Sequence, residues 1–283
     1  MRRIRSFRQS HRGTARLAVA AATALGALLM TAAPARAASY ARADANLNPS
    51  LVLGGTAVSS ADGTITLTTD GQSQSVGTAW TPNKMEVLTG FLATFAFRIS
   101  PDRPEGSGSD GFAFVVQNDP MRTAAMGQPG QDLGFGTNVC PSPALPGISH
   151  SVAVEFDTYQ NAGFCGPKSV GDPNGNHVSV QTRNRGQNTT NDYYSLGDTT
   201  QVPNMHDGTR HDVRISYLAG TLTVDFDGQQ VLSVPMQLSN IGLGESGRAY
   251  VGFTGATGGG SETAQILHFS FEPTTSAGAL STT

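Results

Sequence analysis

The sequence predicts an all-β protein, either a sandwich or a closed barrel, and three observations lead to that prediction. Short segments in which apolar and polar residues alternate recur along the chain, as they do on half-buried strands. Turn residues separate these segments, and the chain contains 34 glycines and 15 prolines. No stretch after residue 37 keeps a helical period. Many short strands with frequent turns are typical of sandwiches and barrels.

The first element, residues 1–37, is expected to be a signal peptide outside the fold. Six arginines without acids precede an almost purely apolar run at residues 17–30, and Ala35-Arg36-Ala37 offers small residues to a signal peptidase. The run is too short to cross a bilayer, so we expect export, cleavage after Ala37 and a secreted, extracellular protein. The leader is typical of bacteria. Its Arg2-Arg3 pair leaves twin-arginine export open beside general secretion.

Length and charge limit the function of the remaining chain. Residues 38–283 number 246, enough for one large β domain, which we expect over 38–272, with a disordered tail at 273–283. The leader holds seven of the 18 basic residues and none of the 21 acidic ones, which leaves a formal charge of −10. Such a negative charge argues against binding to nucleic acid and suits a protein that binds cations. No second apolar stretch is long enough to span a membrane.

The expected strands follow one another along the whole chain. Alternation of apolar and polar residues predicts strands at 63–69, 91–99, 111–117, 152–157, 177–181, 213–217, 221–226, 250–254 and 266–271. Asp227-Gly228 predicts a tight hairpin turn after the strand at 221–226.

Two cysteines, Cys140 and Cys165, occur in the chain. An even count in an exported protein favours one disulfide. The alternative, two buried free thiols, is less favoured because both residues lie in Gly- and Pro-rich segments.

The segment 152–180 carries the most chemical information. Side chains two apart on a strand share a face, so Glu155 and Asp157 point one way while Val154 and Phe156 point the other. Two carboxylates buried side by side are costly without a counter-charge. A bound cation removes that cost.

Two cations fit the polar residues of this segment. Asp157, Asn161 and Asp172 with a backbone carbonyl form a hard oxygen set that suits Ca²⁺. A mixed set with one imidazole suits Mn²⁺ or another transition metal; its members are Glu155, Asp157, Asp172 and His177. The alternative for each residue alone is a solvated turn residue, or for His177 a hydrogen-bonded strand histidine. The combination favours metal.

The chain resembles the legume-type (L-type) lectin family from about residue 40 to 272. The resemblance includes the acidic strand and its loop, with Glu155, Asp157, Tyr159, Asn161, Asp172-Pro173 and His177. Further matching segments, in the family's order, are 46–57, 88–99, 109–114, 133–135, 251–258 and 269–271. A collinear set of motifs is more specific than any one of them.

The resemblance implies an antiparallel jelly-roll β-sandwich, the concanavalin A-like lectin fold, with a third short sheet. It implies manganese on Glu155, Asp157, Asp172 and His177, and calcium on Asp157, Asn161, Asp172 and the Tyr159 carbonyl. Asp110, expected after a cis peptide bond to Ser109, and Asn161 are then expected to bind sugar hydroxyls. Backbone N–H groups near Gly130 and Gly258 can add donors. Phe164 is equally well explained as a stacking aromatic or as a loop-packing residue.

The chain departs from the family in the loop between Asn161 and Asp172, which is longer than usual. The insertion contains Cys165, so a disulfide to Cys140 ties the metal loop to the loop around Leu133. Sugar preference stays open, because this loop helps to shape the pocket. Glycan partners and a homodimer are expectations from the resemblance.

Two other functions are alternatives for this sequence. A laminarinase-like glycoside hydrolase carries Glu-x-Asp-x-x-Glu on such a strand, but the third position here is Gln160, which cannot act as acid and base. A sandwich adhesion module with purely structural metals is the other alternative. The sequence therefore predicts a non-catalytic, Ca²⁺- and Mn²⁺-dependent lectin.

Overall fold

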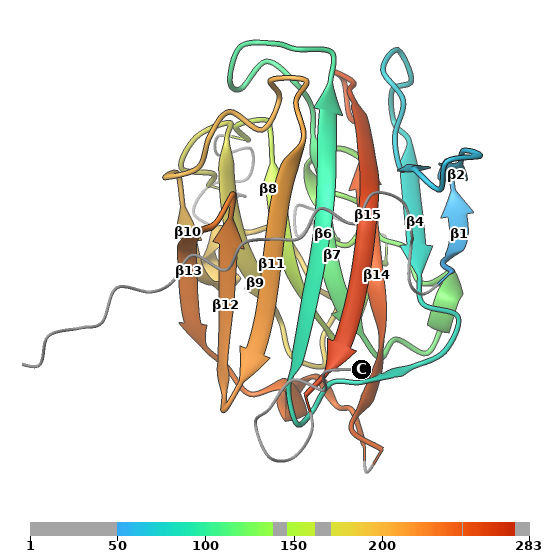
Figure 1. The fold of residues 1–283 in the computed structure, drawn as a ribbon, viewed down its shortest axis with the longest axis vertical. Coiled ribbons are helices and arrows are strands. Elements are labelled where there is room, and N and C mark those ends of the chain that lie inside the picture. The colour runs from blue at the N-terminus through green and yellow to red at the C-terminus, as the bar shows by residue number, and fades with distance from the viewer. Residues whose placement is uncertain (1–49, 138–145, 162–170, 245, 275–283) are drawn as a thin grey trace, which may run out of the picture. The chain divides into compact units, whose positions relative to one another are not determined.

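A computed structural model describes residues 50–137, 146–161, 171–244 and 246–274. Two antiparallel sheets pack face to face, and Figure 1 shows one in front of the other. The front sheet has the order β13 (Gln229–Pro235), β12 (Thr221–Phe226), β11 (His211–Leu218), β6 (Phe91–Ser100), β15 (Thr263–Pro273), β3 (Ile65–Thr66) and β2 (Val58–Ser59).

The back sheet has the order β1 (Val52–Gly55), β4 (Val76–Trp80), β14 (Arg248–Ala256), β7 (Gly111–Gln117), β8 (Ser151–Asp157), β9 (His177–Thr182) and β10 (Ser195–Thr199). β5 (Met85–Glu86) pairs with the start of β14. The helices in the described residues are short 3₁₀ turns, η1 (Arg122–Ala124), η2 (Gly130–Asp132), η4 (Asp192–Tyr194) and η5 (Leu238–Ile241). The prediction of an all-β sandwich is confirmed, and within the described residues no helix is long and apolar enough to span a membrane.

Aromatic side chains fill the space between the sheets. Phe95 on β6 contacts four rings of the other sheet, those of Phe112, Phe114, Phe156 and Phe253, at centroid distances of 6.2, 6.0, 5.7 and 5.0 Å. Phe112 and Phe156 stack on each other at 4.8 Å. The inward side chains of β8 belong to this core while Glu155 and Asp157 point to the outer face, as the alternation predicted.

A second apolar cluster covers the outer face of the back sheet. It joins strand residues to residues of the connection between β7 and β8. Its members are Trp80, Ala113, Val115, Ala125, Leu133, Phe135, Ile148 and Ala153. Because both faces of the sheet are buried here, β7 and β8 contain only buried residues. The cluster also anchors the loop that carries Gly130.

The register of three neighbouring strands positions the functional end. Gly111 on β7 lies opposite Asp157 on β8, and Asp157 lies opposite His177 on β9. Asp110, which precedes Gly111, therefore reaches the same sheet end as Asp157 and His177. Chain segments far apart in sequence meet there because antiparallel pairing aligns the start of one strand with the end of the next.

Most predicted strands are present, but some extents differ. The predicted strand at 63–69 is wrong in length, since only Ile65–Thr66 forms a ladder; Thr68 instead donates a side-chain hydrogen bond to the Glu262 carbonyl oxygen at 2.9 Å. β4, β10 and β13 were not predicted. β4 is buried on both faces and β10 is a mostly polar edge strand, so neither alternates clearly. The hairpin at Asp227-Gly228 is confirmed, with φ values of 47° and 81°.

Candidate functional site

A buried cluster of acids and one imidazole lies at the sheet end described above. Asp157, Asp172 and His177 each offer one ligand atom, and these atoms lie within 4.8 Å of one another. All three residues are buried, with Asp157 at 1% exposure. Asp157 and His177 meet because they are opposed across β8 and β9, while Asp172 comes from the loop before β9.

Glu155 lies beside this group on the same face of β8. Its Oε1 accepts hydrogen bonds from the hydroxyl of Ser179 and from Nε2 of Gln181, the latter at 3.2 Å. The same oxygen is 3.7 Å from Nε2 of His177. Glu155, His177 and the two hydrogen-bond donors therefore form one continuous polar layer on β8 and β9.

Local hydrogen bonds hold the remaining donors in place. The Asn161 backbone N–H donates to Asp172 Oδ2 at 2.6 Å, and the Tyr159 backbone N–H donates to Asp157 Oδ1 at 2.8 Å. His177 Nδ1 lies 3.0 Å from the Asn174 carbonyl oxygen. A carbonyl only accepts, so Nδ1 carries the proton and Nε2 is left with a free lone pair, as metal-binding histidines require.

Each side chain predicted to bind metal leaves one buried atom without a hydrogen-bond partner. These atoms are Glu155 Oε2, Asp157 Oδ2, Asn161 Oδ1, Asp172 Oδ1 and His177 Nε2. Unpaired buried polar atoms are rare in folded proteins because each costs free energy. All five atoms are hydrogen-bond acceptors, so bound cations would satisfy them. As metal ligands, these oxygen and nitrogen atoms fit Ca²⁺ and Mn²⁺. Tyr159 is 44% exposed, and its predicted contribution is through the carbonyl alone.

The pKa values of the carboxyl groups in the cluster also favour a bound cation. Burial raises the pKa of Asp172 to about 8, and the charge of Glu155 adds to that effect. Burial, followed by the charges of Asp172 and Glu155, raises the pKa of Asp157 well above its ordinary value. Burial lowers the pKa of His177, but the neighbouring Glu155 carboxylate, followed by the charge of Asp172, outweighs burial and raises it. Without a cation, protons must neutralise these carboxyl groups.

Asp110, Gly130 and Gly258 meet beside the cluster. The Ser109–Asp110 peptide bond is cis, as the resemblance implied. Asp110 is 4% exposed, and its Oδ2 has no hydrogen-bond partner. A Cβ on Gly258 would lie 2.8 Å from that oxygen and 3.1 Å from the Gly130 Cα, so glycine is required for this close approach. Burial raises the pKa of Asp110 to about 7, although the Gly258 amide opposes the shift.

Some predicted residues lie outside the described part of the chain. These are Phe164 and both cysteines, Cys140 and Cys165, so the stacking ring and the disulfide stay predictions. Gln160, the residue that replaces the hydrolase acid, donates from Nε2 to the Asp172 and Pro173 carbonyl oxygens at 3.3 and 3.4 Å. It therefore supports the Asp172 loop.

Two further buried acids, Asp132 and Glu262, and the half-buried Asp192 lie near the site and were not predicted. Burial raises the pKa of Asp132 to about 7, with a contribution from the charge of Asp110. Burial and then Glu155 raise the pKa of Asp192 to about 7, and Asp192 Oδ1 has no hydrogen-bond partner. Glu262 is fully buried. Its position directly after the glycine-rich loop 258–261 and before a strand was a usable signal, whereas nothing local marks Asp132 or Asp192.

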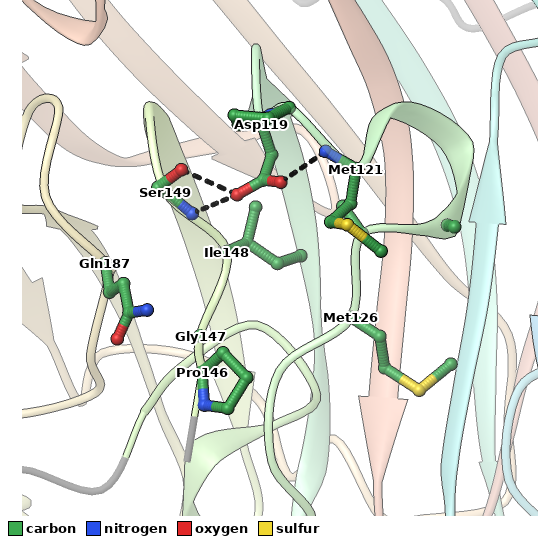
Figure 2. A pocket seen from close by; sticks show the side chains of 11 residues that line it. Asp119, Met121, Met126, Pro146, Gly147, Ile148, Ser149 and Gln187 are labelled. Carbon is green, nitrogen blue, oxygen red and sulfur yellow. Dashed lines mark hydrogen bonds between the residues drawn. The ribbon is translucent and has the colours of Figure 1, made fainter. Parts of the chain in front are cut away.

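A cavity of about 360 Å³ lies at the other end of β7 and β8. Figure 2 shows Asp119 in its wall, hydrogen-bonded to Ser149 and to the Met121 amide beside Ile148. Asp119 is thus satisfied by the protein, and the rest of the lining is mainly apolar. Seven strand residues, about 20 Å, separate this cavity from the acidic cluster.

A family model described as legume lectin beta-barrel domain, the L-type lectin domain, matches residues 43–270. The probable L-type lectin-domain containing receptor kinase S.7 of Arabidopsis thaliana is 29% identical over 192 residues, which cover 64% of this chain and 26% of the kinase. The L-type lectin-domain containing receptor kinase SIT2 of Oryza sativa subsp. japonica is 29% identical over 217 residues, which cover 67% of this chain and 29% of the kinase. The chain thus spans less than a third of the length of these two plant relatives.

Solved lectin structures share the fold. The lectin from Bauhinia forficata in complex with GalNAc is 24% identical with a TM-score of 0.62, over 82% of this chain and 96% of that chain. Peanut lectin is 23% identical with a TM-score of 0.60, over 83% and 94%. The Ca²⁺/Man-bound VIP36 exoplasmic/lumenal domain is 15% identical with a TM-score of 0.57, over 80% and 84%. At these identities the likeness establishes a legume lectin-like sandwich.

Proposed function

We propose that this chain, which belongs to the L-type lectin family, binds glycans at the Asp110 end of its sandwich and depends on Ca²⁺ and Mn²⁺ to do so. The lectin domain indicates a carbohydrate-binding protein that is not an enzyme. Secretion is part of the proposal and rests on the leader at residues 1–37.

One observation carries the metal dependence: five predicted ligands each keep a buried acceptor atom without a hydrogen-bond partner. Calcium would be held by Asp157, Asn161, Asp172 and the Tyr159 carbonyl. Manganese, or another transition metal, would be held by Glu155, Asp157, Asp172 and His177. When bound, the two cations neutralise the acids and fix the loop between β8 and β9.

The saccharide contacts follow from the donors and acceptors at the site. The Asp110 carboxylate accepts from sugar hydroxyls, while the Asn161 side-chain amide donates to them. The Gly130 N–H donates to the Thr257 carbonyl oxygen at 3.1 Å and the Gly258 amide interacts with Asp110, so these two glycines serve the pocket by their lack of a side chain. Phe164 is the proposed stacking partner for the apolar face of a sugar ring. The Ca²⁺/Man-bound form of the VIP36 domain supports joint metal and sugar binding on this fold.

A glycan array tests the proposal. The protein is applied with Ca²⁺ and Mn²⁺, after treatment with a chelator, and after both cations are restored. We expect binding in the first and third conditions and none in the second. Equal binding to the same glycans in all three would overturn the metal dependence, and an array without any signal in metal-loaded protein would overturn glycan binding.

A reducing-sugar assay on a polysaccharide panel separates the hydrolase alternative. We expect no sugar release. Release that Glu155→Gln abolishes and that persists in the presence of a chelator would establish a glycoside hydrolase instead.

A further inference from the structure

A carboxyl group that the metal and saccharide sites do not use is buried directly behind them. Glu262, the residue before β15, is fully buried, and the Thr158 hydroxyl donates to its Oε2 at 2.8 Å. Nδ1 of His206, itself 1% exposed, lies 3.4 Å from the same oxygen. Burying a carboxyl group and an imidazole costs free energy that an apolar pair would not, so their place in the interior needs an explanation.

The segment that carries Asp110 packs directly on this pair. A Cβ at Gly108 would clash with His206 Nδ1 and with Glu262 Oε2, so the backbone lies against both side chains. A Cβ at Gly260 would clash with the Ser109 hydroxyl, which puts the glycine-rich loop against the other side of the segment.

Thr158 connects the same segment to the acidic strand. Its amide donates to the Asp110 carbonyl oxygen at 3.0 Å, and its hydroxyl donates to Glu262. Thr158 directly follows Asp157, a proposed ligand of both cations. One residue therefore holds Asp110 through its backbone and Glu262 through its side chain.

We propose that Glu262 is a positioning residue of the saccharide site, which holds the Asp110 segment against the Thr158 end of β8. This inference deepens the proposed function and rests on it for the identity of the ligand. The geometry predicts that loss of the two polar contacts of Glu262 frees the Asp110 segment to move relative to the metal cluster and weakens sugar binding.

The protonation state of the Glu262 carboxyl group decides which substitution is conservative. Burial raises the pKa of Glu262 to about 8, although the hydrogen bond from Thr158 opposes the shift, and burial lowers the pKa of His206. At neutral pH the pair is then an uncharged acid facing an uncharged imidazole. Glutamine has the same shape, and its side-chain oxygen in the place of Oε2 accepts from Thr158 and faces His206 Nδ1. Glu262→Gln therefore keeps both contacts, whereas Glu262→Leu removes them.

The experiment compares these two variants with a matched control at the far end of the back sheet. Thr81→Val removes a buried hydrogen bond, 3.1 Å long, to the Val251 amide just beyond β4. Hydrogen exchange is measured at the amides of Asp110 and Thr158, which donate to the Ala256 and Asp110 carbonyl oxygens. Sugar Kd is measured by titration calorimetry well below each Tm, with the glycan that wild type binds best.

We expect Glu262→Leu to speed exchange at Asp110 and Thr158 at least tenfold and to weaken sugar binding at least tenfold. Glu262→Gln is expected to stay within threefold of wild type in both measurements. Thr81→Val is expected to lower Tm without changing either. Wild-type exchange at Asp110 and Thr158 in Glu262→Leu would overturn the proposal, as would equal losses in the leucine and glutamine variants.

If Glu262→Leu does not fold, Thr158→Val against Thr158→Ser makes the same comparison, because only serine keeps the hydroxyl. We expect the valine variant alone to speed exchange at Asp110, and wild-type exchange in it would overturn the proposal. Exchange does not depend on any sugar. A wild type that binds no glycan would therefore overturn the proposed function while the exchange data still decide the role of Glu262.

Discussion

Single side chains at the site show a conflict between burial and charge. Asp157 and Asp172 are buried next to each other and next to Glu155, and the pKa values of both aspartates are raised. A native state that holds extra protons loses stability as pH rises through the interval between the unfolded and the folded pKa. For Asp172 that interval runs from 3.8 to about 8. A bound cation replaces those protons and reverses the penalty.

Asp172→Asn is therefore expected to have opposite effects on the two forms of the protein. In chelated protein at pH 8 it removes a buried like charge and raises the free energy of unfolding by on the order of 1–3 kcal/mol. In the presence of Ca²⁺ and Mn²⁺ it removes a ligand and abolishes the metal-induced gain in Tm. Thermal denaturation of both proteins, with and without chelator, checks this. A variant that keeps the full metal-induced gain would contradict the assigned role of Asp172.

Asp110→Ala and Asn161→Ala should separate the saccharide contacts from the metal contacts. Both variants are expected to lose sugar binding, because each removes a hydrogen-bonding group from the pocket. Asp110→Ala should retain wild-type Ca²⁺ affinity, whereas Asn161→Ala should bind Ca²⁺ at least tenfold more weakly. Calorimetric titration of Ca²⁺ and of the sugar measures both. Unchanged Ca²⁺ affinity in Asn161→Ala would remove Asn161 from the ligand set.

At the scale of strands and turns, the packing of β6 against the back sheet is the main support of the fold. Phe95 contacts aromatic rings of β7, β8 and β14. Phe95→Ala should lower the free energy of unfolding by about 3–5 kcal/mol, since it leaves a cavity in this interface. Leu218→Ala on β11, where the side chain is 47% exposed, is the control and should cost far less. Denaturant unfolding measures both, and equal losses would contradict this account of the core.

His211 at the start of β11 links two turns at one end of the front sheet, those that contain Asp207 and Asp227. Its Nδ1 lies 2.8 Å from Asp227 and its Nε2 lies 3.3 Å from Asp207. Burial lowers the pKa of His211, but the hydrogen bond and charge of Asp227, with those of Asp207, outweigh burial and raise it. A raised folded-state pKa stabilises the protein fully below the ordinary histidine pKa of 6.5, and the contribution is lost as pH rises through the folded pKa.

His211→Asn should therefore destabilise the protein more at pH 6 than at pH 9. The difference is expected to be on the order of 1 kcal/mol, because both partner carboxylates are partly exposed. Thermal denaturation in chelator at both pH values isolates this effect from that of the metals. A loss that is equal at the two pH values would show that His211 contributes packing and no charge pairing.

Alternation in the sequence predicted strands with one inner and one outer face, such as β12, and also β7 and β8, which contain only buried residues. β12 at 221–226 and β7 at 111–117 have the predicted bounds, and β8 and β9 differ by one residue. β4 lacks alternation because Trp80 and its neighbours are covered on both sides. The edge strand β10 contains no buried residue, so its sequence need not place apolar side chains on one face. The face that Glu155 and Asp157 share followed from the strand period alone.

At the scale of the whole molecule, the site exists because four distant segments converge on one end of the back sheet. Asp110, Gly130, Asp157 and Gly258 come from separate strand ends and loops. Their residue types suggested chemistry, and the ordered motifs suggested the family. Distances between them depend on strand register and on the outer apolar cluster, which no local pattern encodes. For that reason the contacts of Glu262 and Asp192 with the site were not foreseen.

The most direct measurement is a crystal structure grown with Ca²⁺ and Mn²⁺, with anomalous data collected on both sides of the manganese absorption edge. We predict one peak that changes across the edge beside Glu155, Asp157, Asp172 and His177. A second density within ligand distance of Asn161 should not change across the edge. Ordered carboxylates with only water between them, in crystals grown from a solution shown to contain both metals, would contradict a saccharide site that is built by metals.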